Sequence, residues 1–141
     1  MIDYYIQNDN AEMAISSIQK ANQQDVKVTS VSYKNVCELL LVMNGQGVSK
    51  ESVSKLCKSI CTLSRGGYIV LLGLSPLEMM LAYDNQDYAL KYLQLLKEYD
   101  NGLVKKDIAV LEDLKKRYGK TKAIDSGLDQ IVSLIQRKYE C

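Results

Sequence analysis

The chain of 141 residues is 47% hydrophobic and carries a net charge of +1, from 18 basic and 17 acidic side chains. This length supports one domain with a sizeable core and excludes two independent catalytic domains, while the near-neutral charge excludes a whole-protein field that attracts nucleic acid or anionic membranes. Histidine is absent, which excludes Ser-His-Asp and Cys-His nucleophiles and histidine-ligated zinc.

The first thirty residues predict a strand, a helix and a second strand. Residues 2–7 are β-branched and aromatic, which favours a strand. Asp9 and Glu12 form a capping-box pattern at the start of a helix whose apolar residues recur at helical spacing until Ala21. Residues 26–31 are again rich in β-branched side chains and favour a strand. This order predicts a βαβ unit, in which the two strands are parallel neighbours.

Two more strands are predicted where apolar residues run without interruption. Residues 38–43 suit either a buried parallel strand or the end of a helix that begins near Tyr33, and we favour the strand. Ser49 is a predicted N-cap, and the apolar stripe behind it indicates a helix that ends before the glycine pair at 66–67. Residues 68–74 are continuously apolar, so we place them near the centre of a sheet.

After residue 74 we expect only helices. Ser75 begins a capping-box pattern, and Pro76 occupies the first helical position. Three amphipathic stripes follow, at residues 87–99, 104–118 and 126–139.

Charge is unevenly distributed in this helical part. Residues 76–102 contain two lysines against five acids, whereas residues 103–122 contain seven basic residues against three acids. The simplest interpretation is a pair of packed helices with complementary rims. A second interpretation is nucleic-acid binding by a basic cluster beside Tyr118, which would grip phosphates and stack a base. The candidate nucleic-acid-binding residues are Lys115, Lys116, Arg117, Lys120 and Lys122.

The four cysteines predict a reducing compartment. No CxxC pair occurs, and Cys57 and Cys61 lie one helical turn apart, a separation that suits a disulfide poorly. We expect Cys37 and Cys57 to be buried as small apolar side chains, with Cys141 and the others reduced and no metal bound. No apolar run is long enough to span a membrane and no signal peptide is recognisable at the start, so we expect a cytoplasmic protein.

Residues 35–76 resemble the second half of a class I S-adenosylmethionine-dependent methyltransferase. In that family a buried strand, a polar loop, a helix, a Gly-Gly turn and another strand follow in this order, and the Gly-Gly-Tyr-Ile-Val run at 66–70 matches the turn into its fifth strand. Residues 8–14 and 26–33 resemble the segment after the family's second strand and its third strand. The resemblance covers about 75 of the 141 residues and implies a Rossmann-like fold.

The resemblance also implies where a cofactor would lie. The family's carboxylate that holds the ribose hydroxyls falls at Asn8, with Asp9 beside it, and its carboxylate near the adenine falls at Ser32. The loop after the next strand adds Asn44 and Gly45 as cofactor-binding candidates. No glycine-rich first strand precedes these segments, and each lost buried hydrogen bond to the cofactor costs about 1 to 3 kcal/mol. The resemblance therefore implies a truncated domain with few cofactor anchors.

Together these patterns predict an α/β domain, with a partial, doubly wound, mostly parallel sheet in residues 1–75 and a helical part, residues 76–141, packed on it. An all-helical bundle is the alternative. We expect a truncated or inactive methyltransferase-like domain that binds no cofactor, and we assign no catalytic residues. Such a domain would serve as a regulatory or protein-interaction subunit. Its partner would be another protein or a second copy of this chain. The alternatives are an active S-adenosylmethionine-dependent methyltransferase completed by another chain, and a nucleic-acid-binding helical module. No membrane partner is expected.

Overall fold

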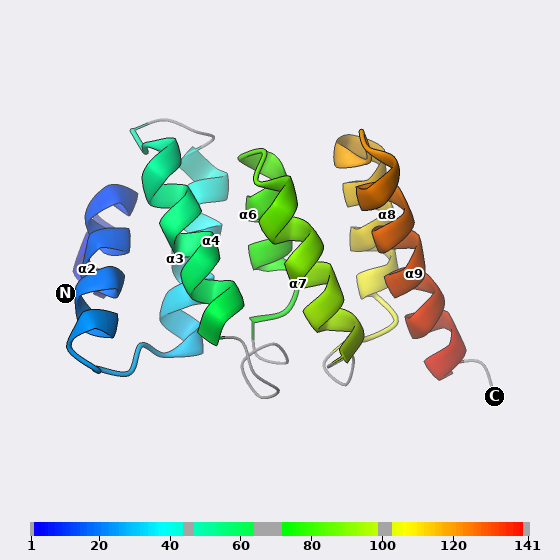
Figure 1. The fold of residues 1–141 in the computed structure, drawn as a ribbon, viewed down its shortest axis with the longest axis horizontal. Helices are drawn as coiled ribbons and strands as arrows, with labels where there is room; N and C mark the ends of the chain where they lie inside the picture. The colour runs from blue at the N-terminus through cyan, green and yellow to red at the C-terminus, as the bar shows by residue number, and fades with distance from the viewer. Residues whose placement is uncertain (1, 44–46, 64–71, 99–102, 140–141) are drawn as a thin grey trace.

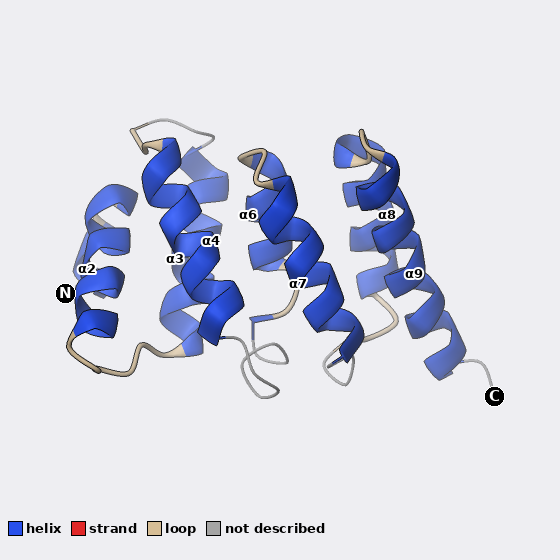
Figure 2. Ribbon diagram, viewed as in Figure 1, coloured by secondary structure: helices blue, strands red, loops and turns tan. Residues whose placement is uncertain are grey.

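The computed structural model describes residues 2–43, 47–63, 72–98 and 103–139. Within these ranges all regular structure is helical, and Figure 2 shows helices joined by loops. The helices are α1 (Ile2–Gln7), α2 (Ala11–Gln23), α3 (Ser30–Met43), α4 (Lys50–Leu63), α6 (Ser75–Ala82), α7 (Gln86–Glu98), α8 (Asp107–Tyr118) and α9 (Lys122–Tyr139). The predicted partial parallel sheet in residues 1–75 is therefore wrong, and the all-helical alternative is confirmed for the described residues.

The helices form two layers that run side by side along the longest axis of the molecule (Figure 1). The first layer contains α1, α3, α6 and α8, and the second contains α2, α4, α7 and α9; within each layer every helix contacts the next. Contacts between α1 and α2, α6 and α7, and α8 and α9 join the layers. The result is a row of stacked helices in which α2 and α9 lie at opposite ends. Such rows are typical of helical-repeat proteins.

One apolar cluster fills the space between the layers along the whole row. It draws on every helix except α1, which packs against it with partly buried side chains. The bulkiest buried side chains include Tyr33, Tyr92, Leu56 and Ile60. Two tyrosine hydroxyls form hydrogen bonds with backbone carbonyls. Tyr92 donates to the Gly73 carbonyl at 2.6 Å, and Tyr83 donates to the Leu40 carbonyl at 2.8 Å.

Residues 2–7 form α1, where a strand was predicted from residue type. Ile2, Tyr5 and Ile6 pack against the core, and their separations of three and four residues place them on one face of a helix. Tyr4, on the opposite face, is 61% exposed. Packing of this apolar face outweighs the weak β preference of the individual residues.

The next two predicted strands also fail, for different reasons. Of residues 26–31, the first four form a loop that buries only Val28, and Thr29 then accepts a hydrogen bond from the Ser32 amide at the start of α3. Residues 38–43 complete α3, so the helical alternative was correct there. Val42 is 81% exposed, which a strand covered on both faces would not allow.

The predicted central strand at 68–74 lies mostly outside the described residues. Leu72 is helical and Gly73 and Leu74 form a turn, so the described end of this segment is not a strand. Since the methyltransferase-like α/β part at 1–75 required this sheet, the Rossmann-like assignment is corrected with it. The helix predicted near Ser75 is confirmed, with Pro76 in its first turn, but the predicted capping box is wrong, because Leu74 is the N-cap and no side chain caps the helix.

In the described part of the chain, no helix combines the length and the apolar character needed to cross a bilayer.

Candidate binding surface

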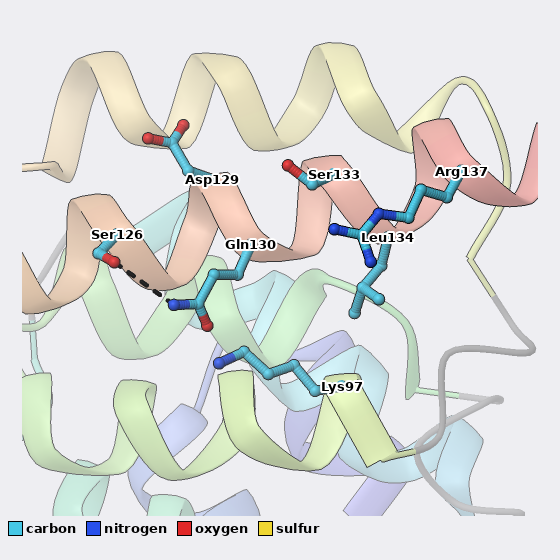
Figure 3. A pocket seen from close by; sticks show the side chains of 7 residues that line it. All are labelled: Lys97, Ser126, Asp129, Gln130, Ser133, Leu134 and Arg137. Atoms are coloured by element: carbon cyan, nitrogen blue, oxygen red, sulfur yellow. Dashed lines mark hydrogen bonds between the residues drawn. The ribbon is translucent and has the colours of Figure 1, made fainter. Parts of the chain in front are cut away.

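The exposed side of the second layer contains a groove between α7 and α9. It encloses about 380 Å³ and is lined by Lys97 of α7 and by six residues of α9, namely Ser126, Asp129, Gln130, Ser133, Leu134 and Arg137. Figure 3 shows Lys97 reaching from α7 toward Gln130, whose amide lies 3.5 Å from the Ser126 hydroxyl. We call this depression the α7–α9 groove.

A glycine sets the distance between the two helices that form this groove. A Cβ atom on Gly127 would lie 2.9 Å from Cδ1 of Leu93, which is shorter than real Cβ contacts. Leu93 is only 2% exposed, so its side chain has little room to retreat. Glycine inside a helix costs about 1 kcal/mol relative to alanine. The close approach of α9 to α7 explains why glycine occupies this position.

A second groove lies between α2 and α4, in the same layer. It encloses about 520 Å³, and its lining consists of Gln19, Asn22, Gln23, Lys55, Lys58, Ser59 and Thr62. An adjoining hollow of about 390 Å³ shares three of these residues and adds Ile15, Ser16, Lys20 and Ser52. We call the two together the α2–α4 groove.

Hydrogen bonds between α2 and α4 fix the floor and one end of the α2–α4 groove. The Gln19 amide donates to the Ser59 hydroxyl at 2.8 Å and to the Lys55 carbonyl at 3.4 Å. Toward the start of α4, the Glu12 carboxylate accepts from the Ser49 amide at 3.1 Å and from the Ser52 hydroxyl. These hydrogen bonds lower the pKa of Glu12 from its ordinary value, the Ser52 hydroxyl contributing most. The ionised carboxylate thus ties the two helices together.

Cations outnumber carboxylates along both grooves. The basic lining residues are Lys20, Lys55, Lys58, Lys97 and Arg137. The one lining carboxylate belongs to Asp129, and it already bonds to Lys115 at 2.8 Å. Lys55 pairs with Glu51 at 3.3 Å, with both side chains well exposed, so this pair contributes little to stability. The linings of the two grooves therefore carry five cations and one carboxylate.

The predicted nucleic-acid-binding cluster lies elsewhere, at the end of α8 and the start of α9. Lys115 bonds to Asp129 at 2.8 Å. Arg117 contacts both Glu78 of α6 and Asp113 at 2.8 Å. The hydrogen bond to Asp129 raises the pKa of Lys115, and the one to Glu78 raises the pKa of Arg117. Two of the five predicted phosphate ligands are therefore engaged by carboxylates. The remaining three, Lys116, Lys120 and Lys122, are exposed.

The pair between Arg117 and Glu78 joins the two sequence segments of opposite charge. Glu78 belongs to the acidic segment and α6, whereas Arg117 belongs to the basic segment and α8. α6 and α8 are neighbours in the first layer. The complementary-rim interpretation is confirmed at this contact.

The predicted cofactor-binding residues are not gathered into one site. Asn8 and Asp9 lie in the turn between α1 and α2, and the Asn8 amide bonds to the Tyr4 carbonyl at 2.8 Å. Ser32 lies in the first turn of α3, beyond the other end of α2. The 13 residues of α2, a length of about 20 Å, therefore separate the two places. Asn44 and Gly45 lie outside the described residues.

Three of the cysteines are packing residues with protonated thiols. Cys37 and Cys57 are fully buried, as predicted, and Cys61 is half-buried with its thiol 3.7 Å from the Tyr88 carbonyl. Burial raises the pKa of Cys37, raises that of Cys57 to about 12 and raises that of Cys61 to about 11. All three are free thiols. Cys141 lies outside the described residues.

Among the described residues, no group of three or more Cys, Asp or Glu side chains is placed to hold a metal ion.

Sequence reasoning missed both grooves. The available signal was spacing, because the second-layer helices begin at Ala11, Lys50, Gln86 and Lys122, at intervals within the range of about 33 to 47 residues that is common in helical repeats. Comparison of the chain with family models, curated proteins and solved structures found no match.

Proposed function

We propose that this chain is a helical scaffold that binds a partner protein on the exposed side of α2, α4, α7 and α9. The observation that carries the proposal is the presence of two grooves between successive helices of this one layer. A row of stacked helices offers an extended surface to a partner, and helical-repeat proteins use such surfaces for binding. The interaction role expected from the sequence is kept, on a different fold.

The chemistry of the two grooves supports binding. Their linings combine amide, hydroxyl and ammonium groups, which form directional hydrogen bonds with a partner. Part of the surface is already fixed, since the Gln19 amide is held by two hydrogen bonds within the protein. Side chains that are ordered before binding lose less conformational entropy on association.

The nucleic-acid-binding alternative shares the helical fold but has weaker support in its proposed site. Lys115 and Arg117 would have to give up the contacts with Asp129, Glu78 and Asp113 before they bound phosphates. The methyltransferase hypothesis keeps one direct test. Calorimetric titration with S-adenosylmethionine would support it if binding were micromolar, and we expect no heat of binding.

Site-specific photo-crosslinking tests the proposed function. A benzoylphenylalanine replaces one exposed residue in each groove, Thr62 or Gln130, and one exposed first-layer residue, Lys34 or Lys116, as matched controls. In extracts of the source cells, the groove positions are expected to yield the same crosslinked protein and the control positions none. Crosslinking of that protein from the first-layer positions alone, or equally from all four, would refute the proposal.

A further inference from the structure

The α2–α4 groove has the features of a site for a linear polypeptide. We infer that it binds an extended, acidic segment of a partner protein, an inference that rests on the proposed function. α2 and α4 are neighbours in the second layer, and the groove follows them over much of their length. The 13 residues of α2 span about 20 Å, which corresponds to about six residues of extended chain.

Charge specifies the chemistry of the segment. The described residues that line this groove include Lys20, Lys55 and Lys58 and no aspartate or glutamate. Lys58 and Lys20 are exposed, and the contact between Lys55 and Glu51 involves side chains that are 58% and 80% exposed. An exposed pair of this kind is exchanged for another carboxylate at little cost. Carboxylates of an incoming segment therefore meet three ammonium groups in the lining. Two carboxylates border the lining, and both are already engaged, Glu12 by Ser52 and Glu51 by Lys55.

The polar residues between the lysines suit a peptide backbone. Gln19 donates from its amide nitrogen to Ser59 and to the Lys55 carbonyl, and these two hydrogen bonds do not engage its amide oxygen, which is an acceptor. Asn22 is held similarly, since its amide nitrogen donates to the Tyr33 hydroxyl at 3.3 Å. Every residue of an extended chain other than proline presents one N–H donor and one carbonyl acceptor. The amide oxygens of Gln19 and Asn22 can accept hydrogen bonds from backbone N–H groups of the bound segment. In a β-sheet, a neighbouring strand would accept these hydrogen bonds.

The lining favours a peptide over a nucleic acid. Single-stranded nucleic acids combine phosphate contacts with stacking of their bases on aromatic rings. Among the described residues of the α2–α4 groove there is no aromatic side chain, so bases would find no stacking platform. Amides and hydroxyls such as those of Gln23 and Thr62 instead match the backbone and side chains of a peptide.

Selection from a random 12-residue peptide library displayed on phage tests this inference. The full chain is compared with the groove variant Lys55→Glu/Lys58→Glu and with the matched control Lys34→Glu/Lys116→Glu, which makes the same charge change on exposed first-layer residues. We expect Asp and Glu to be enriched in peptides selected by the wild type and by the control. A synthetic peptide from this set is expected to bind the groove variant about tenfold more weakly, and to bind the wild type more weakly as salt rises.

Circular dichroism confirms that each variant keeps the helical content of the wild type, and Lys55→Gln/Lys58→Gln replaces the groove variant if it does not. Enriched peptides that are neutral or apolar but crosslink at Thr62 would overturn the acidic segment and leave the proposed function intact. Acidic peptides that bind the groove variant as tightly as the wild type would overturn the site. A uridylate oligonucleotide that binds through Lys55 and Lys58, where no acidic peptide does, would overturn the inference in favour of a nucleic acid.

Discussion

The carboxylate of Glu12 links α2 to the start of α4, and its removal provides a quantitative test of the stacked arrangement. Ser49 caps α4 by accepting from the Ser52 amide at 3.2 Å, and Glu12 accepts hydrogen bonds from both of these serines. In Glu12→Gln, one amide oxygen still accepts from the Ser49 amide, but the negative charge near the helix N-terminus and one acceptor are lost. Since Glu12 and Ser52 are only partly buried, we expect a loss of about 1 kcal/mol at pH 7, or about 4 °C in the melting temperature.

The stability difference between wild type and Glu12→Gln depends on pH, and the lowered pKa of Glu12 determines the direction of this dependence. The pKa of Glu12 is lower in the folded protein than its ordinary value of 4.5, so ionisation stabilises the fold. The stability difference between wild type and Glu12→Gln is therefore complete above about pH 4.5 and disappears as the pH falls through the lowered native pKa. Urea denaturation at pH 7 and at pH 3 measures it, with Glu51→Gln as the control because Glu51 pairs, among the described residues, with the exposed Lys55 of its own helix. Equal losses for the two variants at pH 7, or an unchanged difference for Glu12→Gln at pH 3, would refute the contact.

Four further predictions test the core, the helix spacing and the basic cluster. Tyr92→Phe removes the buried hydroxyl that bonds to the Gly73 carbonyl, and it should lower the free energy of unfolding by about 1 to 3 kcal/mol; an unchanged urea midpoint would contradict this contact. Gly127→Leu should force α9 away from α7 at a cost of about 1 to 3 kcal/mol, seen as a lower melting temperature, and a variant as stable as wild type would contradict the close approach to Leu93. In a Cys141→Ser background at pH 8, iodoacetamide should label Cys61 slowly in the native protein and quickly in urea, because a pKa of about 11 leaves about one thiolate in a thousand; labelling at the rate of a free cysteine would show that Cys61 is not buried. Reversal of Lys115, Lys116 and Arg117 to glutamate should leave filter retention of a uridylate oligonucleotide unchanged, whereas a steep loss would favour the nucleic-acid-binding alternative.

Apolar spacing predicted the later helices well, whereas of the predicted caps at Asp9, Ser49 and Ser75 only Ser49 is present. The Ser49 cap is present, and Pro76 lies in the first turn of α6. Even so, the capping box assigned to Asp9 and Glu12 is wrong, because Asn10 caps α2 and Glu12 turns to α4 instead. A pattern of residue types identifies a helix start but does not determine which of two helices a long side chain reaches.

The predicted strands failed because residue type was given more weight than spacing. In α1, the partly buried Ile2, Tyr5 and Ile6 follow helical spacing although their types favour strands. In α3, the apolar run includes one exposed residue, Val42, and its residue type gives no sign that it lies on the solvent side of the helix. The grooves were beyond prediction for another reason. Each lining combines residues of two helices that are 29 or more positions apart in the chain, such as Lys97 and Ser126, and the angle between the helices decides whether they face one space.

The arrangement of the helices in one row has a mechanical consequence. The α2–α4 groove and the α7–α9 groove share no lining residue, and the helices that carry them are joined in the second layer through the contact of α4 with α7. At the same place in the row, α3 contacts α6 in the first layer, so a slight change of tilt across both contacts would alter the separation of the two grooves. A ligand long enough to occupy both grooves would bind best to one curvature of the row. Its affinity would therefore depend on the free energy needed to bend the protein to that curvature as well as on the contacts at the surface.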